Sequence, residues 1–396
     1  MKSFVNVTQQ IDELPLAVGE LLAGVSPEVL QKNTIGILFC YSDMDAPELV
    51  SLLAQKASFP ILGCTAIATM EHSQGFHDMA ATLMVLTADD CTFASAVSGP
   101  ITPQNVAEEI DKACYSVCQT LGEEPKFLFA LPPYVLEIML DEYASGFNRC
   151  CPGIPVLGGL PSYNAAGDQN LTFFGGEAYP DRLVLFAAGG NLRPVFSVQN
   201  VTSMDADRKR KVTQSKGNVI YRVGNQSFTD YLREVGLPVD SLTQGNTTIT
   251  FVSNPLLLEN AQDGFSFVRT LHEINLEEGS GTAIGQIPVG ATVSICLLQR
   301  SEIEQAAAAG LKSLKEKMAA ASRSGDYLYS TVLAVSCIGR HLLMSPNNDA
   351  EVNSLLAEFP TDLTLAGFYS YGELGPQGPT QTQNFAHNES LILCAL

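Results

Sequence analysis

Three stretches of the chain share one pattern, an apolar run that leads into a glycine. They read "FPILGCTAIATM" from Phe59, "IPVLGGLPSYNAA" from Ile154 and "LTLAGFYSYGELG" from Leu363. An apolar run and a helix-like stretch precede each copy, and a polar loop and another apolar run follow it. Alternating strands and helices are typical of a layered α/β protein, so the repetition predicts internal strand–helix–strand units.

The first two copies continue into a further strand after a turn signal. "LTADDCTFASAV" and "AAGGNLRPVFSV" are interpreted as hairpins, which predicts mixed sheets rather than a doubly wound nucleotide fold. Between residues 246 and 300, "TTITFVS", "FSFVRTLHEIN" and "TAIGQIPVGATVSICLL" are interpreted as antiparallel strands. We expect a mixed α+β protein of two related α/β domains, with mixed β-sheets flanked by helices. A four-layer sandwich of helix, sheet, sheet and helix fits this pattern, with the glycine turns converging near a shared cleft.

Composition sets outer bounds on size and partners. The 396 residues are 46% hydrophobic, enough for two cores, and we divide them into an N-terminal leader (1–33) and domains 34–225 and 226–396. The 42 acidic residues against 22 basic ones give a net charge of −20, which argues against nucleic acid and membranes as partners. The basic segment "DADRKRKVTQSKG" from Asp205 is interpreted as an exposed connection. The start of the chain does not resemble a signal peptide, so a cytoplasmic location is expected.

Neither a metal nor a cofactor is expected from the motifs. The ten cysteines are scattered and are interpreted as free thiols. Cys150 with Cys151, and Cys114 with Cys118, lack the paired spacing of a zinc site. The glycine-rich "EEGSGTAIG" has no lysine after it and predicts a hairpin turn rather than a phosphate loop.

Polar side chains after the glycine motifs are the candidate ligand contacts. Gly63 and Gly372 would let a ligand approach the backbone, and polar groups beside them would bind it. Arg269, in an otherwise apolar strand, would pair with a ligand carboxylate. The other candidates are Cys64, Thr65, Tyr163, Asn164, Tyr371, Glu373, His387 and Asn388.

Each candidate also has a structural interpretation. Glu373 would cap a helix or form a surface ion pair, and His387 with Asn388 would hold down the preceding loop. Arg269 would point to solvent, and Tyr163 with Asn164 would form a turn.

Cys64 raises the question of a catalytic thiol. Gly159 and Phe368 occupy its position in the other two copies, so the fold does not require a thiol there. No Cys–His–Asn signature surrounds it, although His72 and His77 follow in the next loop. We therefore treat Cys64 as a packed or ligand-lining thiol and keep catalysis as the alternative.

Several of these segments together resemble the FIST family, named for F-box and intracellular signal transduction proteins. They are "PILGCTAIATM", "FVRTLHEIN", "IPVGATVSICLL", "GFYSYGELGP" and "FAHNESLILCAL". The resemblance covers nearly the whole chain, although Glu389 and Ser390 stand where the family pattern usually has Gln-Thr. It implies a sensory domain that binds a small ligand, such as an amino acid or a related metabolite. Because no signalling module fits before residue 34, two alternatives stay open: the signal passes to a separate signalling protein, or the protein does not signal.

Three classes of function remain open from the sequence. The first is a cytoplasmic small-ligand sensor, the second a thiol-dependent hydrolase or transferase that uses Cys64, and the third a protein-interaction scaffold. The first predicts saturable thermal stabilisation by a metabolite, and the second predicts selective alkylation of Cys64. The third predicts a co-purifying partner and glycine loops that tolerate bulky substitutions.

Overall fold

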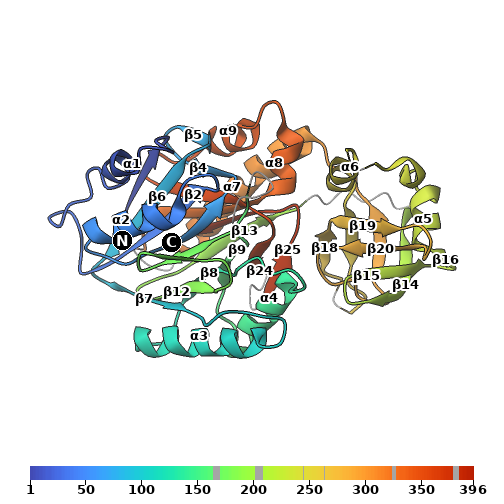
Figure 1. Cartoon of the computed structure of the whole chain (residues 1–396), viewed down its shortest axis with the longest axis horizontal. Coiled ribbons are helices and arrows are strands. Elements are labelled where there is room, and N and C mark those ends of the chain that lie inside the picture. The colour runs from blue at the N-terminus through green and yellow to red at the C-terminus, as the bar shows by residue number, and fades with distance from the viewer. Residues whose placement is uncertain (164–169, 201–207, 244, 263, 323–326, 378–382) are drawn as a thin grey trace.

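The computed structural model describes residues 1–163, 170–200, 208–243, 245–262, 264–322, 327–377 and 383–396. A large body holds both termini, and a smaller domain (residues 208–299) lies at one end of it (Figure 1). Three six-stranded sheets form the large body. The first runs in the order β1 (Lys2–Thr8), β6 (Ala81–Ala88), β2 (Asn33–Tyr41), β3 (Ile61–Ala66), β10 (Thr172–Phe174) and β11 (Glu177–Tyr179).

The second and third sheets repeat this order. The second runs β7 (Cys91–Val97), β12 (Val184–Gly190), β8 (Phe127–Leu131), β9 (Val156–Gly159), β24 (Glu373–Pro376) and β25 (Asn384–His387). The third runs β13 (Val195–Gln199), β26 (Leu391–Ala395), β22 (Thr331–Cys337), β23 (Thr364–Ser370), β4 (Ala68–Glu71) and β5 (Gly75–Asp78). In each sheet the two central strands are parallel and their outer neighbours antiparallel. The predicted repeat is therefore present three times, with mixed sheets.

Each unit gives strands to the sheets of its neighbours. The strand pair that follows the glycine strand crosses over, so β4 pairs with β23, β10 with β3 and β24 with β9. At the opposite edge, β7 pairs with β12 and β13 with β26. The predicted hairpins in "LTADDCTFASAV" and "AAGGNLRPVFSV" are therefore wrong. The turn signals are real, but each turn carries the chain from one sheet to the next, so β6 does not pair with β7, nor β12 with β13.

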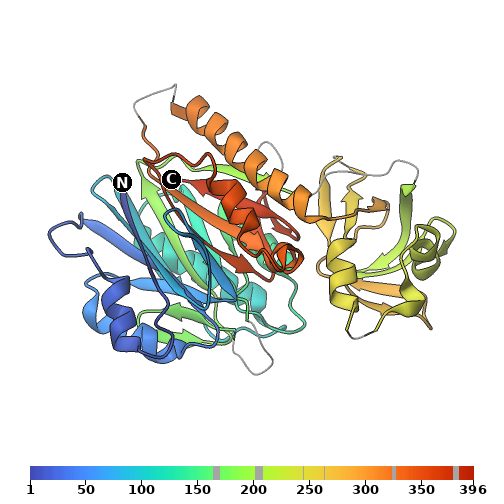
Figure 2. The ribbon, with the colours of Figure 1, turned by 90° about the horizontal axis from the view of Figure 1, so that it is seen from above.

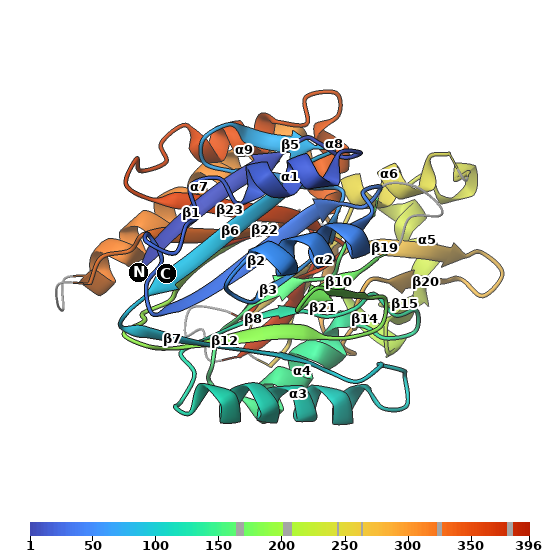
Figure 3. The ribbon, with the colours of Figure 1, turned by 60° about the vertical axis from the view of Figure 1, so that its left-hand side comes forward.

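The three sheets enclose one apolar core, and helices cover their outer faces. The central core joins residues of all three units, including Phe39, Phe129 and Val335. The outer pairs are α1 (Leu14–Leu21) with α2 (Ala46–Lys56), α3 (Val106–Leu121) with α4 (Leu140–Cys150), and α7 (Arg300–Ser322) with α9 (Ala350–Leu356), as Figure 3 shows. The mixed α/β class is confirmed, but the sheets surround a shared core instead of stacking as a four-layer sandwich.

The repeated glycine lies within a strand and not in a turn. Gly63, Gly158 and Gly367 pair with Leu38, Ala130 and Ala334 of the neighbouring parallel strand. A Cβ at any of the three would collide with the carbonyl oxygen of that partner. The glycines therefore permit close packing of two backbones, and this correction removes the reason to expect a ligand beside them.

The small domain is one curled antiparallel sheet with short helices. Its strands run in the order β18 (Ser266–Arg269), β17 (Leu256–Glu259), β21 (Thr292–Ile295), β14 (Arg210–Lys216), β15 (Val219–Val223), β20 (Ser280–Ala283) and β19 (Leu271–Asn275), with β16 (Gln226–Ser227) beside β15. Helices α5 (Phe228–Glu234) and α6 (Thr247–Ser253) and the 3-10 turn η2 (Val239–Ser241) complete it. Thr270 alone separates β18 from β19, so the sheet curls and its two edge strands meet at one corner.

Two segments of the small domain differ from their predictions. "TTITFVS" forms α6 instead of a strand, because the helix buries Phe251 and Val252; the hydroxyls of Thr247, Thr250 and Ser253 bond to carbonyls one turn earlier. In the basic segment, residues up to 207 lie outside the described part of the chain. From Arg210 onward it is strand β14 and not a connection.

The remaining helix, α8 (Ile338–Met344), directly follows β22 and lies between the body and the small domain. Figure 2 shows the long α7 running along the body towards the small domain. Within the described ranges, no helix combines the length and apolar character needed to cross a bilayer. The predicted leader residues include β1 and α1, and the predicted boundary at residues 225/226 falls between β15 and β16.

Replacing the shared glycine tests the close approach of the strands. We expect Gly158→Ala to lower the free energy of unfolding by about 3 kcal/mol or to prevent folding, because the added methyl must displace β8. Gly19→Ala is the control, since no atom lies within 4 Å of that Cβ position in α1 and alanine favours a helix. Urea unfolding measures both, and equal stability of the two variants would contradict the assignment.

Candidate functional site

The small domain is fixed to the body at the corner between β18 and β19. Arg269, at the end of β18, is 1% exposed, and its guanidinium donates to Asp141 Oδ1 of α4 (2.9 Å). It also donates to the carbonyls of Ala386 (2.9 Å), Gln286 and Val268. The rings of Phe267 and Phe385 lie on it, each 4.8 Å from the guanidinium carbon. Arg269 is thus held by the protein itself and joins the two parts of the chain.

Glu389 lies beside this corner, in the turn from β25 to β26. Its Oε1 accepts a hydrogen bond from the hydroxyl of Thr270 (2.8 Å), whereas Oε2 is buried without a hydrogen-bond partner among the described residues. The backbone has a φ of 51°, and Met79 at the equivalent turn of the first unit has a φ of 45°. The positive φ therefore belongs to the fold, and the carboxylate is what distinguishes this copy of the turn.

Burial makes Glu389 easy to protonate. It is 1% exposed, and burial raises its pKa from 4.5 to about 7, although the Thr270 bond and the charge of Arg340 partly offset the shift. Its carboxylate packs on Gly339, where a Cβ would collide with both oxygens. At neutral pH this side chain is therefore close to the midpoint of its titration.

A second buried carboxylate, Glu373 at the start of β24, lies close enough to Glu389 for the two charges to interact. Its Oε2 accepts from the hydroxyl (2.8 Å) and the N–H (3.2 Å) of Ser390. Burial raises its pKa to about 8, and the charge of Glu389 adds to the shift, while the bonds from Ser390 and the thiol of Cys337 oppose it. Glu373 is therefore largely neutral at pH 7 when no ligand is present.

The groups around the two carboxylates are also kept uncharged. Burial, together with the charge of Arg269, lowers the pKa of His387 to about 4, so its imidazole is neutral. Burial and the two carboxylates raise the pKa of the Cys337 thiol well above its usual value. The thiol therefore stays protonated and is not an activated nucleophile.

An ion pair between Arg340 and Glu351 stabilises the turn that holds Glu389. Both side chains are buried, with Arg340 Nη2 and Glu351 Oε1 2.6 Å apart. Glu351 also accepts from the hydroxyls of Ser336 (2.9 Å) and Tyr369 (3.0 Å). Arg340 Nη1 donates to the Glu389 carbonyl (3.4 Å), which ties the turn to α8.

A cavity of about 340 Å³ opens at this junction. The body contributes the end of β22, α8 and the turn before β26, and the small domain contributes α6 and the β18–β19 corner. Polar groups on its wall include Tyr163, Thr270, Tyr371, Asn388 and Glu389. Another cavity of about 410 Å³ lies near residues 27–35 and 93–95, but its lining contains no buried charged side chain. We therefore take the cavity beside Glu389 as the candidate ligand site.

The structure brings part of the predicted site together. Tyr163, Tyr371 and Asn388 line this cavity, and the Tyr371 hydroxyl donates to the Tyr163 carbonyl (3.0 Å). Glu373 and His387 lie next to it without lining it. Asn388 accepts from the Thr270 N–H (3.4 Å) through its side-chain oxygen, so it also helps to hold the corner.

The other predicted residues lie elsewhere. Gly63 is inside β3, and Thr65 bonds to Leu171 through its backbone and hydroxyl. Gly372 accepts from the Leu160 N–H (3.0 Å) in the link before β24. The guanidinium of Arg269 already bonds to Asp141 and to backbone carbonyls. Asn164 lies outside the described residues.

Cys64 belongs to the central core. It is fully buried between the three sheets, and burial raises the pKa of its thiol well above the usual value. His77 contacts Glu71 at 3.3 Å and His72 contacts the same carboxylate at 3.6 Å, so both histidines have another partner. The surroundings of Cys64 thus give it no activating base.

Thr270, Cys337, Gly339 and Glu389 were not among the residues predicted for the site. Thr270 reaches the cavity only through docking of the small domain, and Cys337 and Gly339 reach it through the course of β22 into α8, neither of which periodicity can show. Glu389 did carry a signal, since an acidic residue between His387-Asn388 and an apolar strand is unusual for a buried turn.

Comparison with known families now decides the identity. Residues 34–226 match the FIST N domain and residues 228–376 match the FIST C domain. The chain belongs to the FIST family. FIST domains are associated with sensory signal transduction. A search of curated proteins found no match to this sequence.

The candidate site uses residues of both FIST domains. Ile67 and Tyr163 fall in the FIST N match, whereas the α6, β18–β19 and α8 residues fall in the FIST C match. Glu389 and Asn388 lie beyond the end of the FIST C match at residue 376. The cavity therefore exists only when both regions fold together.

The buried carboxylates predict a pH dependence of stability. Unfolded Glu373 ionises near pH 4.5, whereas the folded protein keeps its proton up to about pH 8. The folded state thus binds more protons in this interval, and the contribution of Glu373 to stability falls as the pH rises. We expect Glu373→Gln to flatten the decline in unfolding free energy between about pH 5 and about pH 8.

Urea unfolding at several pH values measures this slope, and the exposed Glu358, whose side chain is 82% accessible, supplies the control variant Glu358→Gln. A slope that is identical in the Glu373→Gln variant and the parent would show that Glu373 ionises normally.

The ion pair at the corner predicts a large effect on stability. Asp141→Asn keeps the shape but leaves the Arg269 guanidinium buried without its counter-charge, so we expect a loss of about 3 kcal/mol in unfolding free energy. Asp240→Asn, in an exposed pair with Arg233, should leave stability close to that of the parent. Chemical denaturation compares the two, and similar values would contradict the structural role of Arg269.

Proposed function

We propose that this FIST protein is a cytoplasmic sensor that binds a small compound with a protonated amine, such as an amino acid, in the cavity beside Glu389. The observation that carries the proposal is Glu389, a residue of the cavity wall whose buried carboxylate leaves Oε2 without a partner among the described residues. A buried acceptor without a partner is costly, and a ligand donor would satisfy it.

The titration of Glu389 explains why the ligand would be cationic. An ammonium group beside the carboxylate favours its ionised form, so binding would convert a half-protonated side chain into a paired charge. The proton released on binding makes affinity dependent on pH. The apolar wall, which includes Phe251, Val252, Ile284 and Leu342, would bury the aliphatic or aromatic part of the same ligand.

The position of the cavity supports a sensory role. A ligand there would touch α6 and the β18–β19 corner on one side and α8 on the other, so it would bind best to one arrangement of the two parts. The signal would then pass to a separate protein. The ten free cysteines fit a reducing, cytoplasmic location.

The structure offers less support for the other functions considered from the sequence. The hydrolase or transferase hypothesis depends on Cys64, which is enclosed in the central core and kept protonated.

A thermal-shift screen tests the proposal. Amino acids and small amines are compared with matched hydroxy acids, which replace the amine by a hydroxyl. We expect at least one amine to raise the melting temperature saturably, its hydroxy counterpart to have no effect, and affinity to rise from about pH 6 to about pH 8.

Two variants test whether the amine binds beside Glu389. Glu389→Gln keeps the shape of the side chain and should abolish both the shift and its pH dependence, whereas Glu358→Gln on the surface should leave both unchanged. The proposal fails if no amine stabilises the protein, if the hydroxy acid binds equally well, or if Glu389→Gln binds as the parent does.

A further inference from the structure

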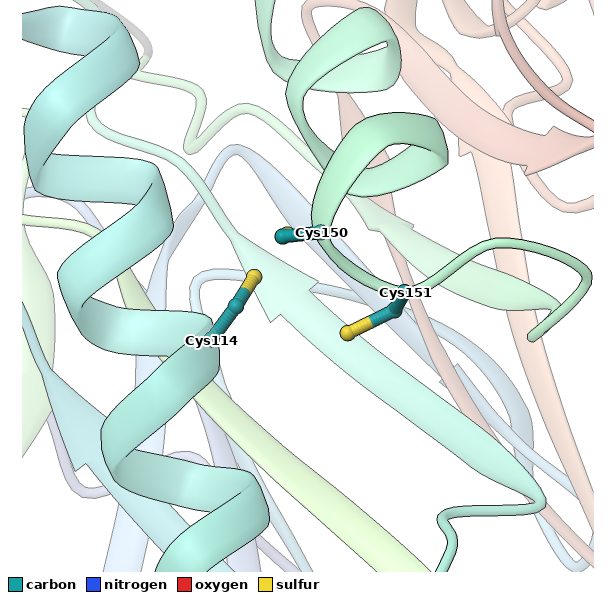
Figure 4. Close-up of side chains that lie close together, drawn as sticks. All are labelled: Cys114, Cys150 and Cys151. Carbon is teal, nitrogen blue, oxygen red and sulfur yellow. The ribbon is translucent and has the colours of Figure 1, made fainter.

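Four cysteine side chains gather where α3 packs against the end of α4, and none of them lines the ligand cavity. Cys114 and Cys118 are one turn apart on α3, Cys150 is the last residue of α4, and Cys151 follows it. Figure 4 shows the side chain of Cys114 turned across the gap between the helices towards those of Cys150 and Cys151. The sequence spacing of each pair alone does not indicate a metal site, but the packing of the two helices combines the pairs.

The distances suit coordination of one ion. The Sγ atoms of Cys114, Cys150 and Cys151 all lie within 4.8 Å of one another, and Cys118 Sγ is 4.0 Å from Cys151 Sγ. In a tetrahedral zinc site with Zn–S bonds of about 2.3 Å, the sulfurs are about 3.8 Å apart. Small side-chain rotations of Cys114, Cys150 and Cys151 would therefore bring their thiols to metal-binding distances, whereas Cys118 lies outside this group of three but next to Cys151.

The surroundings hold the cluster in place. Cys114 and Cys151 are 1% and 4% exposed in the apolar core between the helices and the second sheet. Arg149, the residue before Cys150, bonds to Asp111 Oδ1 (2.7 Å) and to the Ala107 carbonyl (3.2 Å) of α3. The bonds of Arg149 hold the end of α4 against α3 about one turn before Cys114. Cys118 and Cys150 are partly exposed, which gives an ion a route to the buried sulfurs.

We propose that Cys114, Cys150 and Cys151 form a thiolate site for a thiophilic metal ion such as Zn²⁺, with Cys118 as the fourth ligand. A cysteine used only as a small apolar residue needs no other sulfur beside it, and here four meet from two helices. Binding displaces the thiol protons and links α3 to α4 through the ion.

Cobalt titration of the reduced full-length protein tests the site. Co²⁺ reports on thiolate ligands through its charge-transfer absorption, and Zn²⁺ should displace it and raise the melting temperature. We expect a saturable signal that is lost in Cys114→Ser, Cys150→Ser and Cys151→Ser and weakened in Cys118→Ser. Cys91→Ser is the matched control, because Cys91 is a buried thiol outside the cluster that bonds to the Asn191 carbonyl.

Three outcomes would overturn the proposal. In the first, no thiolate absorption appears. In the second, the absorption persists when Cys114, Cys150 and Cys151 are all serine. In the third, the reduced protein takes up no metal but forms a disulfide when hydrogen peroxide is added. The last would identify the cluster as a redox pair. Because Cys150 is partly exposed, its serine variant should fold and keep the test valid even if changes at Cys114 or Cys151 do not.

Discussion

The exchange of edge strands between units is the constraint on which the large body depends. Each glycine strand is flanked on one side by its own unit and on the other by a strand from another unit, as Gly63 is by Leu38 and Phe173. The glycine is needed because β2 and β3 approach closely at that pair. No sheet is complete within one unit, and the three units share a central core in addition to the apolar layer that each sheet has under its own helices.

The sequence predicted the parts of this structure that depend on local pattern. The three apolar runs into glycine indicated the repeat, and most strands, together with the helix-like stretch in each unit, follow from periodicity. Two kinds of feature could not be predicted. A turn signal such as Asp89-Asp90 shows that the chain reverses, but not that the next strand joins another sheet. In "TTITFVS", β-branched residues favoured a strand, but burial of Phe251 and Val252 stabilises a helix.

The candidate site shows the same limit. Tyr371, Glu373, His387 and Asn388 were found from the sequence because they follow the last glycine motif, and the fold does place them together. Thr270 and Gly339 were not found, since they reach the site only through docking of the small domain and the course of α8. Arg269 was chosen for the right chemistry, a buried guanidinium that binds a carboxylate, but its carboxylate belongs to Asp141. A charge in an apolar strand indicates a partner without saying whether that partner is a ligand or the protein.

Because the units share sheets, the boundaries of the family matches do not coincide with the boundaries of units that can fold alone. The FIST N match ends at residue 226, yet β4, β5 and β13 within it complete a sheet whose central strands, β22 and β23, come after residue 330. A fragment cut at that boundary would leave β13 and the edge of β4 that faces β23 without their partner strands, and exposed edges of this kind promote aggregation. During synthesis on the ribosome, the first sheet has all its strands once residue 179 has emerged, whereas the second and third sheets must wait for strands that come after residue 330.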